Sequence, residues 1–422
     1  MKRHSPLRVV VLGGGFGGLA FCKELADSRF AVTLIDRQNH HLFQPLLYQV
    51  ATGGLSAPEI AHPIRSILRD QKNVTVLMEE VQSLDLATCS VQLATRVVAC
   101  DYLIIALGAR TGYFGRDEWE QHAPGLKTLD DAQRIRADAL GCFERAESTS
   151  NPAEREALLT SVVVGGGPTG VEMAGALAEL SKKVLARDFR RIKTAEAKVV
   201  LIEAGPRLLP AFDPSLSAYA RAKLEKMGVT VKTNTPVQNI TAGEVTAGGE
   251  VIRAATIVWA AGVEASPVTR GLGVPVDRSG RIQVRPDLSL PGHNNVFAVG
   301  DIAVLTDAKG RRVPGVCPAA IQMGRHVARL LHHEVRHAEK YHVALPRPAF
   351  AYFDKGNMAT IGRNAAVAET RCMKARGFVA WLMWLFIHLL FLVGFRNRLF
   401  VFMQWVYSYF TWQRGARIIL RK

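Results

Sequence analysis

The sequence predicts an α/β protein, because a pattern of strand, glycine-rich turn, helix and second strand occurs twice among its 422 residues. The first copy starts near the N-terminus and the second lies in the middle of the chain. Each copy ends at an acidic residue. The C-terminal tail differs from both copies, since it is rich in apolar, aromatic and basic residues. We therefore expect two α/β domains of one type and a helical C-terminal segment.

The first copy runs from an apolar strand at Arg8–Leu12 to Asp36. The turn Gly13–Gly18 follows the strand, a helix is expected over Leu19–Ala26, and a second strand over Ala31–Ile35. Glycines in such a turn let the backbone approach a pyrophosphate, and the helix N-terminus offers free N–H groups to the phosphates. The closing acid accepts hydrogen bonds from ribose hydroxyls. The pattern therefore predicts a Rossmann-like dinucleotide-binding fold.

The second copy has the same order of elements. The strand Ser161–Val164 leads into the turn Gly165–Gly170, a helix is expected from Val171, and the strand Lys198–Ile202 ends at Glu203. A single glycine-rich turn is weak evidence, since glycines also mark ordinary turns. Two copies, each bracketed by the expected strands and acid, predict two dinucleotide sites, and so hydride transfer between two nucleotides.

The two closing acids differ in their spacing from the turn. Asp36 lies 23 residues after Gly13, whereas Glu203 lies 38 residues after Gly165, which requires a longer helix and linker. An acid at this position repels a 2′-phosphate, so NADH is favoured over NADPH. Arg207, which follows closely, leaves NADPH open.

Three later strands complete the two folds. Asp101–Gly108 and Ala255–Gly262 are matching apolar strands that end in small residues, and each is expected to return the chain to a nucleotide site. Asn295–Asp301 is a further apolar strand that ends in Gly-Asp. By itself, Asp301 equally fits the cap of a following helix.

Composition limits the class of protein. With 48% hydrophobic and 21% charged residues, the chain is expected to form two or three globular domains. The net charge of +16 raises the question of nucleic acid, but residues 363–422 contain ten Lys or Arg and one acid, so the charge favours an anionic membrane surface. We expect no nucleic-acid partner. The six scattered cysteines predict reduced thiols. The histidine pairs lack the spacing of metal ligands, so no metal site is expected. Met1–Leu7 has no apolar leader, so the catalytic part of the protein is expected in the cytoplasm.

The tail contains Phe378–Phe395, a run of 18 residues without charge. Alone it is a candidate transmembrane helix near the minimum length, or a buried core helix. A span would translocate the arginines that follow, which is unfavourable. In Leu399–Trp412, Gln404, Ser408 and Thr411 form one polar stripe on an aromatic helix. These features favour a monotopic anchor that lies in the membrane interface.

Several stretches of the sequence resemble a known family. The two glycine-rich turns, Val296–Asp301, Phe43–Ala51, Asp354–Arg363 and the tail Gly377–Arg417 are similar to the type II NADH:quinone oxidoreductases, and the resemblance covers nearly the whole chain. It implies a flavoprotein that oxidises NADH with FAD and reduces a membrane quinone by two electrons without pumping protons. It also implies a peripheral enzyme on the cytoplasmic face of the inner membrane, and it leaves a homodimer open.

The resemblance assigns regions and binding residues. It implies an FAD-binding domain over 1–120 and 290–330, an NADH-binding domain over 121–289, and a membrane-anchoring domain over 331–422. The residues expected to bind FAD are Gly13, Gly15, Phe16, Gly17, Gly18, Asp36, Arg37, Ala106, Gly108, Gly300, Asp301, Ala319 and Ala320. Those expected to bind NADH are Gly165, Gly167, Pro168, Thr169, Gly170, Glu203 and Gly262.

Three residues are expected to take part in catalysis. The counterpart of Glu172 in the family is near the flavin and the quinone, although an acid in the first turn of a helix can simply complement the helix dipole. Lys355 approaches the flavin in the family pattern, but a Lys in Asp-Lys-Gly is also an ordinary turn residue. Gln322 matches the second of two family glutamines, and Pro318 stands where the first would be.

Other functions fit the same architecture. A sulfide:quinone oxidoreductase needs cysteines beside the flavin, and a dithiol reductase needs a redox-active cysteine pair after the first fold. The scattered cysteines and the complete second motif disfavour both. A membrane-bound sensor that binds FAD and NADH without turnover remains a non-enzymatic alternative.

Overall fold

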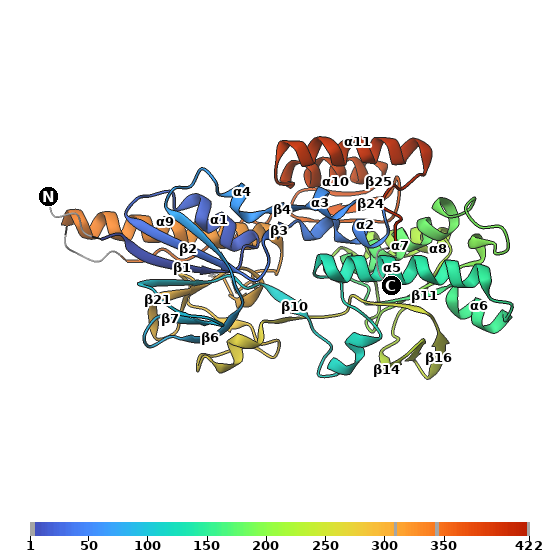
Figure 1. Ribbon diagram of the computed structural model, residues 1–422, viewed down its shortest axis with the longest axis horizontal. Coiled ribbons are helices and arrows are strands. Elements are labelled where there is room, and N and C mark those ends of the chain that lie inside the picture. The colour runs from blue at the N-terminus through green and yellow to red at the C-terminus, as the bar shows by residue number, and fades with distance from the viewer. Residues whose placement is uncertain (1–4, 308–309, 342–345, 420–422) are drawn as a thin grey trace. The chain divides into compact units, whose positions relative to one another are not determined.

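The computed structural model describes residues 5–307, 310–341 and 346–419, and its internal contacts divide it into two compact units (Figure 1). Unit 1 consists of Met1–His41, His62–Arg110 and Val263–Asp354. Unit 2 consists of Leu42–Ala61, Thr111–Gly262 and Lys355–Lys422. The assignment of an FAD-binding, an NADH-binding and a membrane-anchoring domain by function remains a prediction.

Unit 1 is built on a six-stranded sheet in the order β20-β21-β9-β1-β2-β5. The central strand β1 (Leu7–Leu12) is parallel to β2 (Phe30–Asp36) and β9 (Tyr102–Ile105). The flanking strands β5 (Val74–Met78) and β21 (His293–Ala298) continue the parallel order, and only β20 (Ser289–Leu290) is antiparallel. Val9, Val11 and Leu12 are fully buried, as expected for strands covered on both faces.

Two helices of unit 1, α1 (Phe16–Glu24) and α9 (Cys317–Tyr341), pack closely together. Figure 1 shows them side by side. A Cβ atom at Gly324 would collide with the carbonyl oxygen of Gly17, so glycine permits this approach. A three-stranded antiparallel sheet, β6 (Val81–Asp85), β7 (Ser90–Leu93) and β8 (Val97–Ala99), adds buried residues to the same core.

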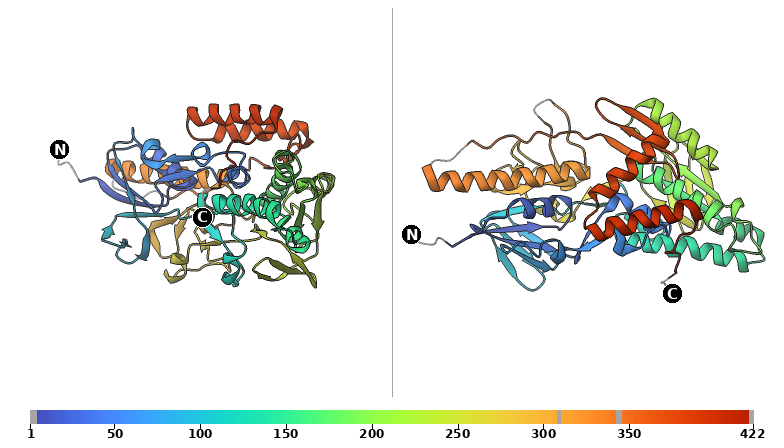
Figure 2. Two further views of the ribbon diagram at one scale, coloured as in Figure 1. Left: turned by 45° about the vertical axis from the view of Figure 1, so that its right-hand side comes forward. Right: turned by 90° about the horizontal axis from the view of Figure 1, so that it is seen from above.

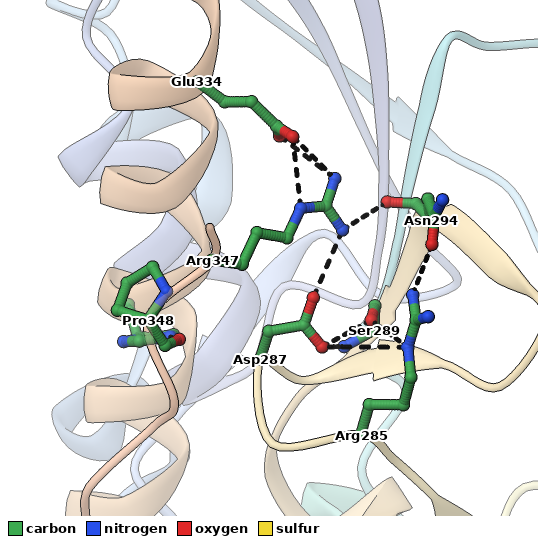
Figure 3. A network of polar contacts seen from close by, with 8 residues as sticks. Arg285, Asp287, Ser289, Asn294, Glu334, Arg347 and Pro348 are labelled. Carbon is green, nitrogen blue, oxygen red and sulfur yellow. Dashed lines mark hydrogen bonds and ion pairs between the residues drawn. The ribbon is translucent and has the colours of Figure 1, made fainter. Parts of the chain in front are cut away.

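The segment 346–354 of unit 1 is fastened along α9 by polar contacts (Figure 3). The guanidinium of Arg347 pairs with the Glu334 carboxylate at 3.0 Å and with Asp287 at 3.2 Å. Farther along, the side-chain amide of Gln322 makes two hydrogen bonds with the main chain of Phe353. Its Nε2 donates to the carbonyl oxygen at 3.0 Å, and its Oε1 accepts from the N–H at 2.9 Å. These contacts fix the chain up to Phe353, two residues before Lys355.

Unit 2 contains a four-stranded parallel sheet in the order β13-β12-β11-β17. Its strands are β11 (Thr160–Val164), β12 (Lys198–Ile202), β13 (Val229–Lys232) and β17 (Thr256–Trp259). The larger helices around it are α5 (Leu129–Ser148), α7 (Pro168–Glu179) and α8 (Pro214–Lys226), with α6 (Pro152–Leu158) before β11. A separate antiparallel sheet contains β14 (Val237–Thr241), β15 (Glu244–Ala247) and β16 (Glu250–Arg253).

The C-terminal part of unit 2 is a three-stranded sheet followed by two helices. The strands are β23 (Asn357–Thr360), β24 (Ala366–Glu369) and β25 (Lys374–Gly377), and the helices are α10 (Phe378–Phe391) and α11 (Phe395–Thr411). Figures 1 and 2 show the two helices next to each other. The uncharged run is interrupted before α11, where Gly394 has a φ of 85°. Across the described ranges, no helix has the length and hydrophobicity needed to cross a membrane.

The segment 42–61 leaves the first fold and belongs to unit 2. It forms the short helices α2 (Leu47–Ala51) and α3 (Ala57–Ile60). The sequence predicted no helix or strand for this stretch. Its position in unit 2 brings Tyr48 and Gln49 to the cavity described below.

The predicted strands are present, but three of them stop earlier than expected: β9, β17 and β21 end at Ile105, Trp259 and Ala298, before the small residues that were expected to close them. Two helix boundaries were also wrong. The helices expected from Leu19 and Val171 begin at Phe16 and Pro168, three residues earlier in each copy. The reason is shared: the glycine before each helix, Gly15 or Gly167, is the N-cap, so the last glycine of the motif lies in the first helical turn.

Candidate functional site

The first glycine-rich turn can exist only with glycine at two positions. Gly13 has a φ of 102°, and a Cβ there would collide with the carbonyl oxygen of Ala106, at the end of β9. A Cβ at Gly18 would collide with the carbonyl oxygen of Gly13. A Cβ at Gly15 would meet no atom within 4 Å. The turn therefore leaves open space at a helix N-terminus, which fits a pyrophosphate.

The second turn repeats this geometry in unit 2. Gly165 has a φ of 108°, and a Cβ there would lie 2.6 Å from the carbonyl oxygen of Ala260. A Cβ at Gly170 would collide with the carbonyl oxygen of Gly165, and one at Gly167 would meet nothing within 4 Å. Pro168 and Thr169 are exposed at the start of α7. Both turns thus fit a dinucleotide by the same physical criterion.

The closing acids are held by the backbone in the same way in both copies. Asp36 accepts hydrogen bonds from the backbone N–H of Gly14 at 2.6 Å and of Gln38 at 2.7 Å. Glu203 accepts them from Gly166 at 2.5 Å and from Gly205 at 2.6 Å. Each carboxylate is therefore fixed beside its turn, where a ribose would bind.

His41 contacts the backbone of the first turn. Its Nδ1 lies 3.0 Å from the carbonyl oxygen of Gly14, and its ring meets that of Phe16 edge-on at 4.8 Å. Burial lowers the pKa of His41 to about 4. The ring is therefore neutral at physiological pH and adds no charge to the turn.

The remaining predicted FAD residues lie around the start of α9 and the ends of two strands. Ala319 and Ala320 are buried in the first turn of α9, and Gly300, with a φ of 79°, packs against Ala320. Asp301 is partly exposed beside Gly315, and Gly108 has a φ of 67°. Arg37 is exposed and faces Glu80 at 3.8 Å. In unit 2, Gly262 lies close to the carbonyl oxygen of Gly112.

Unit 2 contains a mainly apolar cavity of about 520 Å³. Helices α10 and α11 supply most of its apolar wall, including Trp381, Trp384 and Trp405. The polar part of the wall comes from α2, α7, the turn after β23 and the residues after α11. The charged residues that line it are Glu172, Glu179, Arg363 and Arg414.

Glu172 is a buried acid in the wall of this cavity. Its Oε1 accepts a hydrogen bond from the backbone N–H of Thr360 at 3.2 Å, and the residue is only 9% exposed. Burial raises the pKa of Glu172 to about 8. The hydrogen bond from Thr360 and the nearby indole of Trp384 oppose that shift, although the indole N–H makes no well-aligned hydrogen bond within the described ranges. The carboxyl group is therefore largely protonated near pH 7.

A second acid on α7 forms an ion pair. Glu179 follows Glu172 by two helical turns, and its carboxylate pairs with Arg414 at 3.1 Å. It also accepts the backbone N–H of Arg363 at 2.5 Å. The Arg363 guanidinium donates to the carbonyl oxygens of Ser408 and Tyr409 and lies 3.4 Å from the centre of the Trp412 ring. These contacts fasten the end of α11 to α7.

A chain of hydrogen bonds crosses from α11 to α2. The indole N–H of Trp405 donates to Gln49 at 2.8 Å, and the amide of Gln49 donates to the Tyr48 hydroxyl at 2.9 Å. Burial raises the pKa of Tyr48 well above its usual value, with Glu172 adding to the effect. The phenol is therefore neutral and can donate a hydrogen bond into the cavity.

The structure does not place the three predicted catalytic residues in one unit. Glu172 lines the cavity, whereas Lys355 is exposed in unit 2 with its Nζ 5.3 Å from the centre of the Phe391 ring. Gln322 belongs to unit 1, where both ends of its amide are occupied by Phe353. Their roles in catalysis remain predictions.

Sequence reasoning missed several cavity residues. The spacing of seven between Glu172 and Glu179 is a signal that could have placed both acids on one helix face. Tyr48 and Arg414 lie in stretches that carry the family resemblance, but neither stretch indicates the cavity, because each residue reaches it from a distant part of the chain.

Comparisons with known proteins agree with this geometry. Residues 7–324 match the pyridine nucleotide-disulphide oxidoreductase family, and residues 355–412 match the C-terminal domain of NDH2 proteins. The type II NADH:quinone oxidoreductases NdhA and Ndh of Mycobacterium tuberculosis are 45% and 44% identical to this chain. The alignments cover 98% and 99% of this chain, and 89% and 90% of the relatives. A structure of NDH2 from Plasmodium falciparum in complex with NADH shares the fold, with a TM-score of 0.89, 20% identity and coverage of 98% of this chain and 100% of that one.

The two nucleotide folds define an α/β oxidoreductase of the pyridine nucleotide-disulphide class. Within that class, the chain belongs to the type II NADH:quinone oxidoreductases. The prediction of an NADH:quinone oxidoreductase that uses FAD and NADH is confirmed, and so is the prediction of the two-nucleotide α/β fold.

Proposed function

We propose that this enzyme oxidises NADH with FAD held by the first fold and reduces a membrane quinone whose headgroup enters the cavity of unit 2. The observation that carries the proposal is the position of Glu172, a protonated carboxyl group in an apolar cavity whose wall contains α10 and α11. A volume of about 520 Å³ is in the range of small-molecule sites.

The two glycine-rich turns would hold the nucleotides. Gly13, Gly15, Phe16, Gly17 and Gly18 would carry the FAD pyrophosphate, with Asp36 and Arg37 at the adenosine end. Gly165, Gly167, Pro168, Thr169 and Gly170 would carry that of NADH, with Glu203 on its ribose. The fixed carboxylate of Glu203 disfavours a 2′-phosphate, and Arg207 is occupied by the carbonyl oxygens of Pro210 and Phe212. Both features favour NADH over NADPH.

The flavin ring would be held by residues from several segments. Ala106, Gly108, Gly300, Ala319 and Ala320 would surround it, and Gly262 would face the NADH side. Asp301 would hold the ribityl chain. The N-terminus of α9 would place its partial positive charge at the ring, where negative charge develops. FAD supplies the chemistry of this step: it accepts a hydride and passes two electrons onward.

The protein itself must manage protons at the quinone, because two-electron reduction of a quinone to a quinol consumes two protons. Glu172 would donate one of them through its protonated carboxyl group, and Tyr48 would orient the quinone carbonyl as a neutral hydrogen-bond donor. Lys355 would act at the flavin side. Gln322 would act indirectly, by holding Phe353 and thereby the segment that leads to Lys355.

The two C-terminal helices would form a monotopic membrane anchor. On α10, Phe378, Leu382, Phe386 and Leu390 recur at intervals of four and are 47–65% exposed. On α11, Phe402, Met403, Val406 and Phe410 are exposed. Phe402, Val406 and Phe410 also line the cavity, together with Ser408 of the predicted polar stripe. Such a surface fits burial in the acyl boundary, with the arginines of the tail on anionic lipid. We place the enzyme on the cytoplasmic face of the inner membrane, and a homodimer remains part of the proposal.

Stopped-flow spectroscopy tests the proposed function. NADH should bleach the flavin absorbance of the purified holoenzyme, and a ubiquinone or menaquinone analogue should restore it. Glu172→Gln should leave the bleaching rate unchanged and slow reoxidation by the quinone. If sulfide bleached the flavin and NADH did not, or if neither did, the proposed function would be wrong.

A further inference from the structure

Two of the six cysteines meet in unit 1, although ten residues lie between them in the sequence. Cys89 precedes β7 and Cys100 follows β8, so the antiparallel pairing of these strands brings them opposite each other. Their Sγ atoms are 3.1 Å apart, and the backbone N–H of Cys100 donates to the carbonyl oxygen of Cys89 at 2.9 Å. Both residues are 5% exposed. The two thiols are thus held in contact by a paired backbone.

The immediate surroundings favour a thiolate on one of the two sulfurs. The Cys100 thiol lies within hydrogen-bonding distance of both the sulfur and the carbonyl oxygen of Cys89. This contact lowers the pKa of Cys89 and raises that of Cys100. Arg8 and Asp101 form an ion pair nearby. Their charges have opposite effects on the pKa of Cys89, because Arg8 lowers it and Asp101 raises it. Of the two sulfurs, Cys89 is thus the one whose ionisation the contact favours.

We propose that Cys89 and Cys100 form a reversible dithiol–disulfide pair that is oxidised by hydrogen peroxide. The Cys89 thiolate attacks one peroxide oxygen, the O–O bond breaks, and Cys89 becomes a sulfenic acid while hydroxide leaves. The Cys100 sulfur then attacks the Cys89 sulfur, the S–O bond breaks, and a second hydroxide leaves. The hydroxides take up protons, one of them from the Cys100 thiol. In sum, two thiols and one peroxide give one disulfide and two waters.

The two sulfurs need to move only a short distance to form the disulfide. A disulfide bond is about 2.0 Å long, so the sulfurs need to approach by about 1.1 Å. The described ranges contain no group of three or more His, Cys, Asp or Glu arranged to hold a metal ion. Disulfide formation also protects Cys89 from oxidation beyond the sulfenic acid, which is otherwise irreversible in most proteins.

The pair lies at the end of the sheet opposite the first glycine-rich turn. Strand β9 begins two residues after Cys100, and its other end carries Ala106, which contacts Gly13. Four residues of β9 separate the two ends, about 13 Å at the usual rise per residue. Oxidation would therefore fasten the start of β9 to β7 without touching the nucleotide turn. We expect the oxidised enzyme to retain its FAD.

Peptide mapping of the peroxide-treated holoenzyme tests the proposal. The full-length protein with bound FAD is treated with hydrogen peroxide, alkylated under denaturing conditions and digested. We expect a cross-linked peptide that contains Cys89 and Cys100, has lost two hydrogens and is restored by dithiothreitol. Alkylation of Cys89 and Cys100 after a treatment that oxidises the exposed Cys372 would overturn the proposal, and so would a cross-link between other cysteines.

Single variants separate the two roles. In Cys100→Ser, Cys89 should accumulate a sulfenic acid that dimedone traps, at least tenfold faster than Cys100 does in Cys89→Ser. Cys142→Ser is the matched control, since Cys142 is also buried in a core but lies in unit 2 and contacts Thr256. It should form the cross-link at the wild-type rate. Equal trapping rates in the first two variants would contradict the assigned roles, and loss of the cross-link in Cys142→Ser would contradict the assigned pair.

Discussion

The backbone N–H of Gly166 donates a hydrogen bond to Oε2 of Glu203 at 2.5 Å, and in the other unit Gly14 makes the same contact with Asp36 at 2.6 Å. The second glycine of each motif thus holds the acid that closes the motif. A sequence distance of 37 residues in one copy and 22 in the other leads to the same local geometry. Each acid is fixed before a nucleotide binds, so its charge contributes to selection without a conformational change.

Replacing Glu203 by Gln should weaken the preference for NADH. The amide oxygen of Gln can still accept one of the two backbone hydrogen bonds, while the negative charge is lost. Hydrogen bonds to charged groups exceed neutral ones by about 1 kcal/mol, so the ratio of kcat/KM for NADH to that for NADPH should fall about fivefold to tenfold. Steady-state kinetics with both donors measures this ratio. Asp36→Asn serves as control and should weaken FAD retention but leave the ratio unchanged; an unaltered ratio in Glu203→Gln would contradict the assignment.

The pKa of Glu172 predicts how stability depends on pH. The folded carboxyl group has a pKa of about 8 because of burial, against 4.5 ordinarily. Between these pH values the folded state therefore binds one more proton than the unfolded state. The contribution of Glu172 to the free energy of unfolding is complete below pH 4.5 and declines as the pH rises to about 8, where the folded carboxyl group ionises. The slope is at most about 1.4 kcal/mol per pH unit. Urea unfolding of the wild type and Glu172→Gln at pH 5 to 8 measures it.

The expected result is that Glu172→Gln gains stability relative to the wild type as pH rises. Tyr48, Glu179 and Arg414, which also face the cavity, are present in both proteins, so their contributions cancel. A difference that stayed constant from pH 5 to pH 8 would show that the carboxyl group titrates normally.

The buried ion pair of Arg414 with Glu179 should couple the end of the chain to α7. Arg414→Met leaves Glu179 without its charged partner, and such a loss typically costs about 3–5 kcal/mol. The double variant Glu179→Gln/Arg414→Met should recover most of that loss, because no unpaired charge remains. A double-mutant cycle of unfolding free energies gives the coupling. Additive effects of the two changes would argue against a direct interaction.

Two charges on the exposed face of the C-terminal helices should abolish membrane binding. Phe386 is 65% and Phe410 78% exposed. Phe386→Glu/Phe410→Glu should lose about 3 kcal/mol or more of apolar burial, about a hundredfold in partitioning to vesicles that contain phosphatidylglycerol. Co-sedimentation measures this. Val251→Glu is the matched control, because Val251 is 60% exposed on β16, and it should bind like the wild type.

Gly15→Ala should separate folding from flavin binding. A Cβ at Gly15 has no protein atom within 4 Å, so the fold should tolerate it, but it would occupy the space proposed for the pyrophosphate. We expect at least a tenfold loss of FAD affinity with an unchanged unfolding midpoint of the apoprotein. Gly141→Ala on α5 also meets open space and should retain FAD while gaining about 0.5–1 kcal/mol of stability. Tight FAD binding by Gly15→Ala would place the pyrophosphate elsewhere.

The sequence by itself determined the two nucleotide folds, because their signals are local. Strand, glycine, helix and acid follow one another within about forty residues, and the chemistry of the turn fixes which positions must be glycine. The strand Lys198–Ile202 was predicted with its observed bounds. The two helices start three residues earlier than predicted, and β9, β17 and β21 end before the small residues that were expected to close them.

Only the tertiary structure brought together the cavity and the thiol pair. Glu172 bonds Thr360 across 188 residues, Arg414 reaches Glu179 across 235, and Tyr48 arrives on a segment that leaves one fold for the other unit. Cys89 and Cys100 seemed unrelated until strand pairing set their register. Such contacts depend on how helices and strands that are distant in the sequence pack against one another. Side-chain periodicity describes each helix or strand alone and carries no information about that packing. The same packing removes water from Glu172, and this desolvation gives an ordinary glutamate its raised pKa.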